Sequence, residues 1–431
     1  MSLVTALYTG ATGLQSNSTE LSVVGDNIAN SNTIGFKASR AAFADAMADN
    51  LLGGGAGQRG LGVKLEAIQK IVSQGALTNT GLATDLAIQG NGMFVVKGSA
   101  GGQTGSYYTR AGQFTVNKDG LLVNLDGMRV QGYTADATGN VRASAVGDLK
   151  VGNSTAAPRA STSVTIRANL QNDAAIPSAA FDVANPSATS NFATSVTVYD
   201  SIGAAHQVDV YFCKTGAGTW DYHALSDGGG LTGGTAGTQV EIASATGVTF
   251  DGQGRMTAAP AATGTFNPIG ATNPQALAFN VGTPPPAGTG VDGLTSFAAP
   301  SAASFISQDG FASGELSRIS IDAKGQVVGG FTNGDTRVLG QVAMATFGAP
   351  DQLMRVGGSL FQAMPSSGPA NVGAPSSADR GSIVAGALEQ SNVDLASEFI
   401  RMIAAQRGFQ ANSKTLTTAD SLLNELVQLK R

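Results

Sequence analysis

Apolar residues recur every seven positions at both ends of the chain. In the N-terminal segment a second seven-residue series occupies the alternating position of the same helical seam and consists of Leu3, Gly10, Asn17 and Val24. A seven-residue repeat of this kind places its members along one face of an α-helix. The sequence therefore predicts an amphipathic helix at each end. The predicted seam residues are Leu7, Leu14, Leu21 and Ile28 in the first helix, and Leu395, Met402, Phe409, Leu416 and Leu423 in the second.

Polar residues indicate where these two helices begin and end. The run from Asn30 to Gly35 competes for backbone hydrogen bonds and tolerates left-handed conformations, so the first helix should end near Asn30. Ser391, followed three residues later by Asp394, can cap the start of the second helix. The stretch from Phe43 to Leu52 also has a helix-like pattern.

The middle of the chain consists of short alternating runs separated by turn residues. Residues 114–116 and 121–123 flank the turn sequence of residues 117–120 and predict a β-hairpin. Residues 195–199 and 207–213 predict another, around a turn at 200–203. The middle is therefore expected to be all-β.

These patterns predict a multidomain α+β fold. The terminal helices should form a coiled-coil-like domain, and two mainly-β domains should be inserted outward from it, each within the one before it. The expected ranges are 1–30 and 391–431 for the terminal helical domain, 31–75 and 376–390 for a linker or joint region, 76–148 and 307–375 for an inner β domain, and 149–306 for an outer β domain that is partly variable.

Composition narrows the classes of function. The chain has 431 residues, of which 58 are glycine and only 6% aromatic, and this favours β-rich modules with small side chains over a compact enzyme. The net charge of −5, without a basic block, argues against nucleic acid as a partner. The sequence contains neither an apolar run long enough for a membrane span nor the pattern of a cleaved secretory signal.

Few residues offer chemistry. Cys213 is the only cysteine, which excludes an intramolecular disulfide and a multi-cysteine metal site, and an inert thiol is expected. The only histidines, His206 and His223, do not have the spacing of a zinc site, and no nucleophile-elbow motif occurs. The sequence therefore predicts no catalytic residue, no cofactor and no metal.

The two helical seams remain the most informative feature. Apolar seams usually face the core of their own domain. Here they lie at opposite ends of the chain with a β-rich middle between them, which implies that the ends meet each other or the ends of other copies.

Two sequence blocks resemble a known family. Residues 27–37, preceded by Gly13-Leu14, and residues 386–395, continued at 402–403 and 406–414, are similar to the flagellar axial family of rod, hook and hook-associated proteins. The matching signature residues are Asn27, Ile28, Ala29, Asn30, Gly35, Phe36, Ser391, Asn392, Val393, Gln406 and Arg407.

Other segments refine the resemblance within that family. Residues 85–94 and 108–112 are shared with rod proteins, whereas 196–200 and 340–343 resemble hook subunits. Gly408 stands where many relatives carry a better helix former, and it is expected either to permit close packing or to weaken the helix locally.

The resemblance implies a structural subunit of the bacterial flagellar hook, which self-assembles into a curved, flexible helical tube and couples the rod to the filament as a universal joint. It also implies type III flagellar export without a cleaved signal, an extracellular location, and rod, junction and cap proteins and the export apparatus as partners besides the chain itself. The alternatives are a distal rod or hook-associated axial protein and, in a different class, a surface-displayed adhesin or enzyme module.

Overall fold

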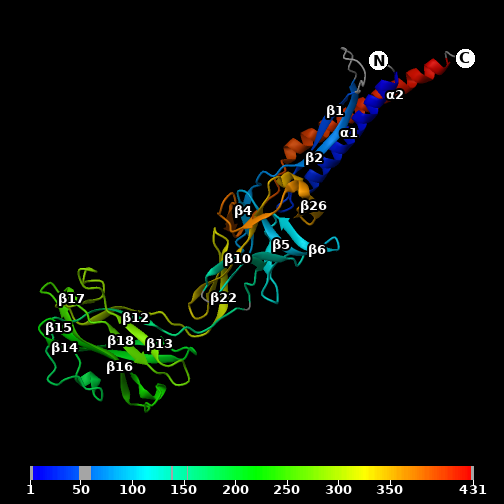
Figure 1. Ribbon diagram of the computed structural model, residues 1–431. Helices are drawn as coiled ribbons and strands as arrows, with labels where there is room; N and C mark the ends of the chain where they lie inside the picture. The colour runs from blue at the N-terminus through cyan, green and yellow to red at the C-terminus, as the bar shows by residue number, and fades with distance from the viewer. Residues whose placement is uncertain (1–2, 48–59, 137–138, 153, 429–431) are drawn as a thin grey trace. The chain divides into compact units, whose positions relative to one another are not determined.

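The computed structural model describes residues 3–47, 60–136, 139–152 and 154–428, and within these ranges the protein is mostly β with one long helix near each end of the chain (Figure 1). Helix α1 spans Leu3–Ala29 and helix α2 spans Leu395–Gln428. This confirms the prediction that the first helix ends near Asn30. The chain then turns through Gly35, whose φ of 68° is left-handed.

The start of α2 differs from the prediction. The Asp394 carboxylate, not Ser391, caps the helix by accepting the Ala396 amide hydrogen at 3.0 Å. A hydrogen bond from Ser397, with two backbone amides, lowers the pKa of Asp394 and so favours the charged form at the positive helix end. The Ser391 hydroxyl instead accepts from the Val393 amide in the preceding turn. The predicted cap was therefore assigned three residues too early.

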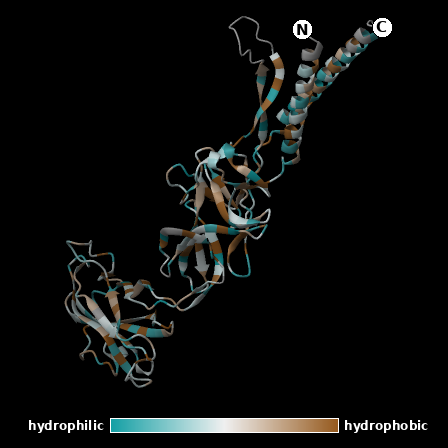
Figure 2. Ribbon diagram, turned by 45° about the vertical axis from the view of Figure 1, so that its right-hand side comes forward, coloured by the Kyte–Doolittle hydropathy of each residue, from teal (hydrophilic) through white to brown (hydrophobic). Residues whose placement is uncertain are grey.

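A β-ribbon lies beside α1 (Figure 2). Its strands are β1 (Ser39–Met47) and β2 (Gly60–Lys70), which pair antiparallel with two irregularities in register. The helix-like interpretation of residues 43–52 is therefore wrong up to Met47, and 48–52 lie outside the described residues. The alanines of β1 are good helix formers, but pairing with β2 overrides their local preference.

The described residues fall into two compact units. The first contains the chain up to residue 152, with 318–330 and the part from 336 onward. In its main sheet the strand order is β23-β24-β9-β5-β6-β27-β26. Besides β1 and β2, its strands are β3 (Leu77–Asn79), β4 (Leu86–Gln89), β5 (Met93–Ala100), β6 (Gln103–Thr109), β7 (Phe114–Val116), β8 (Leu122–Asn124), β9 (Arg129–Ala135), β10 (Val141–Asp148), β23 (Gln326–Phe331), β24 (Thr336–Val342), β25 (Met344–Thr346), β26 (Met354–Gly357), β27 (Leu360–Gln362), β28 (Asn371–Gly373), β29 (Ser382–Ala385) and β30 (Ala387–Glu389).

The core of the first unit corrects two expected boundaries. Leu149 and Val151 are buried in it, so the outer β segment does not begin at residue 149. The ranges 31–75 and 376–390 are not simple linkers, because they contain strands: β1 and β2 lie in the first range, and β29 and β30 lie in the second and pair with β4 and β3. Strands this short, with mostly small side chains, lack the alternation of apolar and polar residues that identifies strands from sequence.

The second unit covers residues 154–317 and 331–335. One sheet has the order β13-β14-β15-β16-β17, and the other has β18-β19-β12-β20 with β21 on the far edge of β12. Both sheets contribute to one core around Trp220, Tyr222 and Phe266. Its strands are β11 (Thr155–Ala156), β12 (Ser163–Asn169), β13 (Phe192–Tyr199), β14 (Ala205–Gly216), β15 (Thr219–Asp227), β16 (Gln239–Phe250), β17 (Met256–Ala258), β18 (Ala262–Phe266), β19 (Gln275–Asn280), β20 (Leu294–Thr295) and β21 (Ala302–Gln308), while β22 (Gly314–Ile321) crosses the boundary between the units along the chain.

The hairpin turns share one hydrogen-bond pattern. In the β13–β14 turn, Asp200 Oδ1 accepts the Ile202 and Ala204 amide hydrogens at 3.0 and 2.9 Å, and Gly203 has a φ of 86°. The side chain thus holds the turn, and glycine takes the left-handed position. The same pair of bonds recurs at Asn117, Asp251 and Asp322. The hairpins predicted at 117–120 and 200–203 are confirmed.

Candidate assembly faces and a buried polar joint

Small residues make the contact between α1 and α2. A Cβ atom on Gly13 would lie 2.6 Å from Asn412 Nδ2, and one on Gly408 would lie 2.7 Å from Asn17 Oδ1. Each helix thus presents a glycine to an asparagine of the other. Gly10 lies in the same contact, beside the Asn412 backbone. Of the two interpretations of Gly408, the structure supports close packing.

The N-terminal seam lies at the edge of this contact. Leu7, Leu14, Leu21 and Ile28 are half-buried, whereas Val24, from the alternating series, is 1% exposed. The α1–α2 contact is therefore centred nearer to the series that contains the small residues.

The C-terminal seam is divided between two environments. Met402 and Leu416 are half-buried, while Leu395 and Phe409 are exposed, and the side chain of Leu423 lies outside the described residues. Among the α2 side chains that the structure describes, the buried apolar ones are Ala405 and Ala419. The seven-residue repeat thus does not follow the face that α2 turns toward α1.

An apolar flank of α2 remains exposed. At 100° per residue, its members lie within about 120° of one another on the helix surface. We call it the α2 apolar face. It consists of Leu395 (42% exposed), Phe399 (49%), Ile403 (50%) and Phe409 (40%).

The β1–β2 ribbon contacts α1 through another small residue. A Cβ atom on Gly62 would overlap the Thr12 side chain, and the Val63 amide hydrogen is donated to Thr12 Oγ1 at 3.4 Å. Large apolar side chains of the same strand, Leu61, Leu65 and Ile68, are exposed. The ribbon therefore adds a second apolar surface beside the helices.

Asn27 connects three segments where α1 ends. This buried side chain exchanges two hydrogen bonds with the Ser39 backbone, at 2.8 and 2.9 Å, and donates a third to Glu398 of α2 at 3.2 Å. Phe36 is also buried, beneath the Arg355 guanidinium at 4.7 Å. These two signature residues thus fix the path of the chain from α1 into the β-ribbon.

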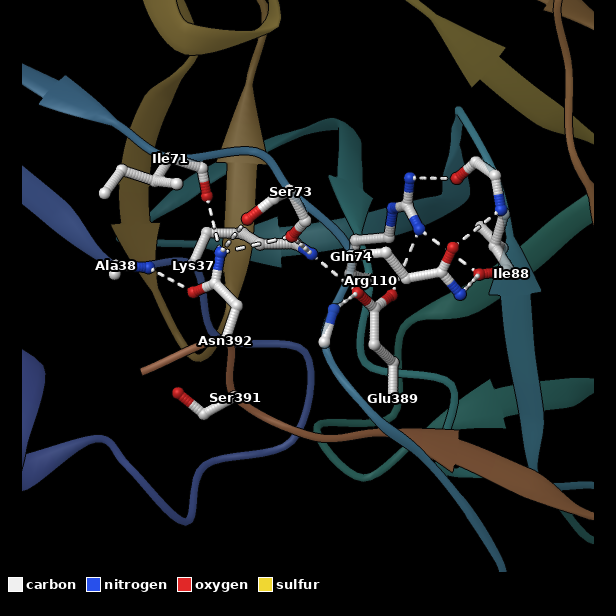
Figure 3. Close-up of polar contacts among 12 residues, drawn as sticks. Lys37, Ala38, Ile71, Ser73, Gln74, Ile88, Arg110, Glu389, Ser391 and Asn392 are labelled. Atoms are coloured by element: carbon white, nitrogen blue, oxygen red, sulfur yellow. Dashed lines mark hydrogen bonds and ion pairs between the residues drawn. The ribbon is translucent and has the colours of Figure 1, made fainter. Parts of the chain in front are cut away.

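Asn392 does the same before α2. Its Oδ1 accepts the Ala38 amide hydrogen at 2.8 Å, and its Nδ2 donates to the carbonyl oxygens of Ile71 and Ser73 (Figure 3). The other signature residues are less central: Ile28, Asn30, Ser391 and Val393 are half-buried, and Ala29, Gln406 and Arg407 are exposed.

Glu389 forms the centre of a buried ionic cluster that the sequence did not indicate. Its Oε1 accepts from Lys37 Nζ at 2.6 Å and from the Gly75 amide at 2.9 Å, and its Oε2 accepts from Arg110 at 3.0 Å (Figure 3). We call Lys37, Arg110 and Glu389 the Glu389 cluster. All three side chains are at most 7% exposed.

Burial sets the electrostatics of this cluster. Desolvation lowers the pKa of Lys37, and its hydrogen bond to Glu389 opposes that shift. The pKa of Arg110 is likewise lowered by burial and raised again by Glu389. Arg110 also donates to the Gly90 carbonyl at 2.7 Å, and Lys37 to that of Ser73 at 2.6 Å. The carboxylate is therefore what keeps both cations stable in the interior.

Gly35 fits beside the Glu389 cluster because it has no side chain. Its amide hydrogen is donated to the Glu389 carbonyl at 2.8 Å, and a Cβ atom would lie 2.5 Å from the Ala111 nitrogen. We expect Gly35→Ala to lower the unfolding free energy of the first unit by about 2–4 kcal/mol, through left-handed strain and overlap together. Hydrogen exchange of β30 is the measurement.

Gly81→Ala is the matched control for that substitution. Gly81 has a similar φ of 73°, but its Cβ position is open. We expect the control to show the strain alone, about 1 kcal/mol. Equal effects of the two substitutions would contradict the role of close approach at Gly35.

Other candidate groups have structural partners. His206 bonds to Asp200 at 3.1 Å and His223 to Glu241 at 3.2 Å. Burial raises the pKa of the Cys213 thiol to about 11, so it is largely protonated at neutral pH. Among the described residues there is no group of three or more potential metal ligands. Neither of the two helices, over its described length, could span a membrane.

Models of known protein families match four segments of the chain. Residues 7–37 match the family described as flagellar basal body rod protein, 87–179 the flagellar hook protein FlgE/F/G D1 domain, 169–311 the flagellar basal body protein FlaE D2 domain, and 384–429 the flagellar basal body rod FlgEFG protein C-terminal family.

Curated relatives match over their full length. The flagellar hook protein FlgE of Borreliella burgdorferi is 36% identical over 99% of this chain and all of its own, and that of Escherichia coli is 33% identical with the same coverage. The FlgE protein of Treponema pallidum is 34% identical, with both chains covered completely.

Proposed function

Because the chain belongs to the flagellar hook protein family and is a structural subunit of the hook, we propose that it polymerises through its terminal helices, with the α2 apolar face as the principal contact between copies. The supporting observation is the exposure of four large apolar side chains on one flank of a helix whose other flank is occupied by α1. Burying them against the helices of other copies gives a favourable free energy, about 1 kcal/mol or more for each.

The same contact explains a tube. In this proposal the α2 apolar face of one copy packs against a different surface of the next copy, because α1 of the same chain already occupies the other flank of α2. A heterologous contact that does not close generates an open helical array. In this proposal α1 and α2 form the coiled-coil-like inner layer of the tube.

The finer functions follow from the family and belong to the same proposal. The polymer is a curved, flexible tube that acts as a universal joint between rod and filament. Its partners are rod proteins, junction proteins, a cap and the flagellar export apparatus, and its location is extracellular, reached without a cleaved signal peptide. None of these roles requires a catalytic residue or a cofactor.

Before assembly the helices should be the least protected part of the chain. The α2 apolar face lacks its partners in a monomer, and most side chains of α2 are exposed. We expect limited proteolysis of a verified monomer to remove roughly residues 1–30 and 391–431 first. The fluorescence of Trp220, the only tryptophan, should not change, since it lies in the core of the second unit. Resistant, helical termini in the monomer would contradict assembly-coupled ordering.

A polymerisation assay tests the proposal as a whole. Purified chain at rising concentration should pass from monomer to tubes visible by electron microscopy, with the helical signal in circular dichroism rising in step. Tubes that form from a chain lacking residues 391–431 would refute the role of α2.

A further inference from the structure

The two cations of the Glu389 cluster precede their anion by most of the chain. Lys37 and Arg110 lie 352 and 279 residues before Glu389. The ion pairs that the structure gives for these two cations are both with Glu389. Any chain that ends before residue 389 therefore contains two cations destined for the interior without their carboxylate.

The neighbours of Glu389 in sequence close the same region. Strand β29 pairs with β4 over Ser382–Ala385, and β30 pairs with β3 over Ala387–Glu389. The Gln390 amide hydrogen is donated to the Ala76 carbonyl at 2.8 Å. Asn392 adds bonds to Ala38, Ile71 and Ser73 (Figure 3), so residues 382–392 contact β3, β4, the chain before β1 and the connection from β2 to β3. We call residues 382–392 the closing segment.

We propose that the closing segment makes folding of the first unit conditional on completion of the chain, with Glu389 as the residue that imposes the condition. A buried cation without a partner is strongly unfavourable, and removal of one member of a buried ion pair is far more damaging than absence of the whole pair. Lys37 and Arg110 therefore oppose closure of an incomplete first unit and favour it once Glu389 arrives.

Synthesis from the N-terminus gives this condition its effect. The closing segment is made after the segment that follows α1, after β3 and β4, and after Arg110. In this proposal these earlier parts do not pack together until the closing segment is present. The second unit has no such requirement, because nearly all of it lies within residues 154–317. The end of α1 is thereby kept from its final position on the β-strands until the closing segment, which directly precedes α2, has been made.

Refolding of the full chain tests the order of events. Diluted from denaturant at a concentration too low for assembly, the chain is pulse-labelled by hydrogen exchange and analysed by mass spectrometry. We expect β5, β6 and β9 to gain protection together with residues 382–392, while β14 and β15 of the second unit gain it independently. Protection of β5, β6 and β9 well before the closing segment would overturn the proposal.

A substitution tests the role of the charge. Glu389→Gln keeps the shape and leaves both cations unpaired, so exchange in β5, β6 and β9 should rise with that of residues 382–392, on the order of 100-fold. Asp148→Asn, which removes the partly exposed carboxylate 2.6 Å from Arg129 in the same unit, is the matched control and should change exchange little.

The result for Glu389→Gln distinguishes coupling from a local role. If the variant leaves the first unit unprotected while β14 and β15 keep their protection, the condition is supported in its strongest form. A rise confined to residues 35–38 and 382–392 would mean that Glu389 only anchors its own segment, and the proposal would be refuted.

Discussion

Replacement of Phe399 and Phe409 by aspartate should give a folded monomer that forms no tubes. Both side chains are 40% or more exposed on α2, so their loss removes little from the monomer. In a polymer the two carboxylates would be buried in an apolar contact, at a cost of several kcal/mol for each copy. Since every copy repeats the contact, the critical concentration for assembly should rise by at least about a thousandfold.

Sedimentation and electron microscopy measure this outcome, with a control on the same helix. Ala404 is exposed but lies about 100° or more from the α2 apolar face on the helix surface. Ala404→Asp should therefore assemble at close to the normal concentration. Normal tubes from the double aspartate variant would show that this face is not the contact, and loss of assembly in the control would point to a general effect of negative charge.

Removal of the second unit should change the shape of the tube but not its existence. The structure indicates suitable end points for the deletion. Arg159 and Phe311 exchange two backbone hydrogen bonds of 2.9 Å where the chain enters and leaves the second unit. A short Gly/Ser linker in place of residues 160–310 joins adjacent ends and leaves Leu149 and Val151 in the core of the first unit. Such a replacement should not disturb folding of the remainder.

The expected polymer of this variant is straight. A curved tube needs outer contacts that differ between its inner and outer sides, and we assign those contacts to the second unit. Electron microscopy of the polymers decides the matter. Unchanged curvature would place the origin of shape in the first unit, and failure to assemble would place an essential contact in the second.

The sequence predicted elements that depend on local pattern. The heptads identified both helices, and the run after Ala29 gave the end of the first, because terminal polar residues and glycine act on the backbone beside them. The hairpin turn at Asp200 was predicted for the same reason: its side chain bonds to amides two and four residues away. Strand β1 was predicted as helix-like because its alanines favour helix. Its strand conformation depends on pairing with β2, which the local sequence does not indicate.

Contacts between distant segments were beyond prediction. The repeat gave the correct helices but not which side of α2 meets α1, because the contact is made by Gly13, Gly408 and their asparagine partners instead of the large apolar residues. Lys37, Arg110 and Glu389 occur in the sequence blocks that resemble relatives, but nothing in their spacing pairs them. A buried ion pair depends on three-dimensional proximity, which no local pattern encodes.

The Gly–Asn contacts between the helices also bear on how the protein responds to its surroundings. The Asn17 amide is held by its own helix, through a 2.7 Å bond to the Gly13 carbonyl, and faces uncharged atoms of α2. Dissolved salt screens interactions between charges and has little influence on the fit of neutral groups. The stability of the α1–α2 pairing at these contacts should therefore change little with ionic strength. Salt should instead weaken exposed ion pairs, such as the one between Arg355 and Asp26.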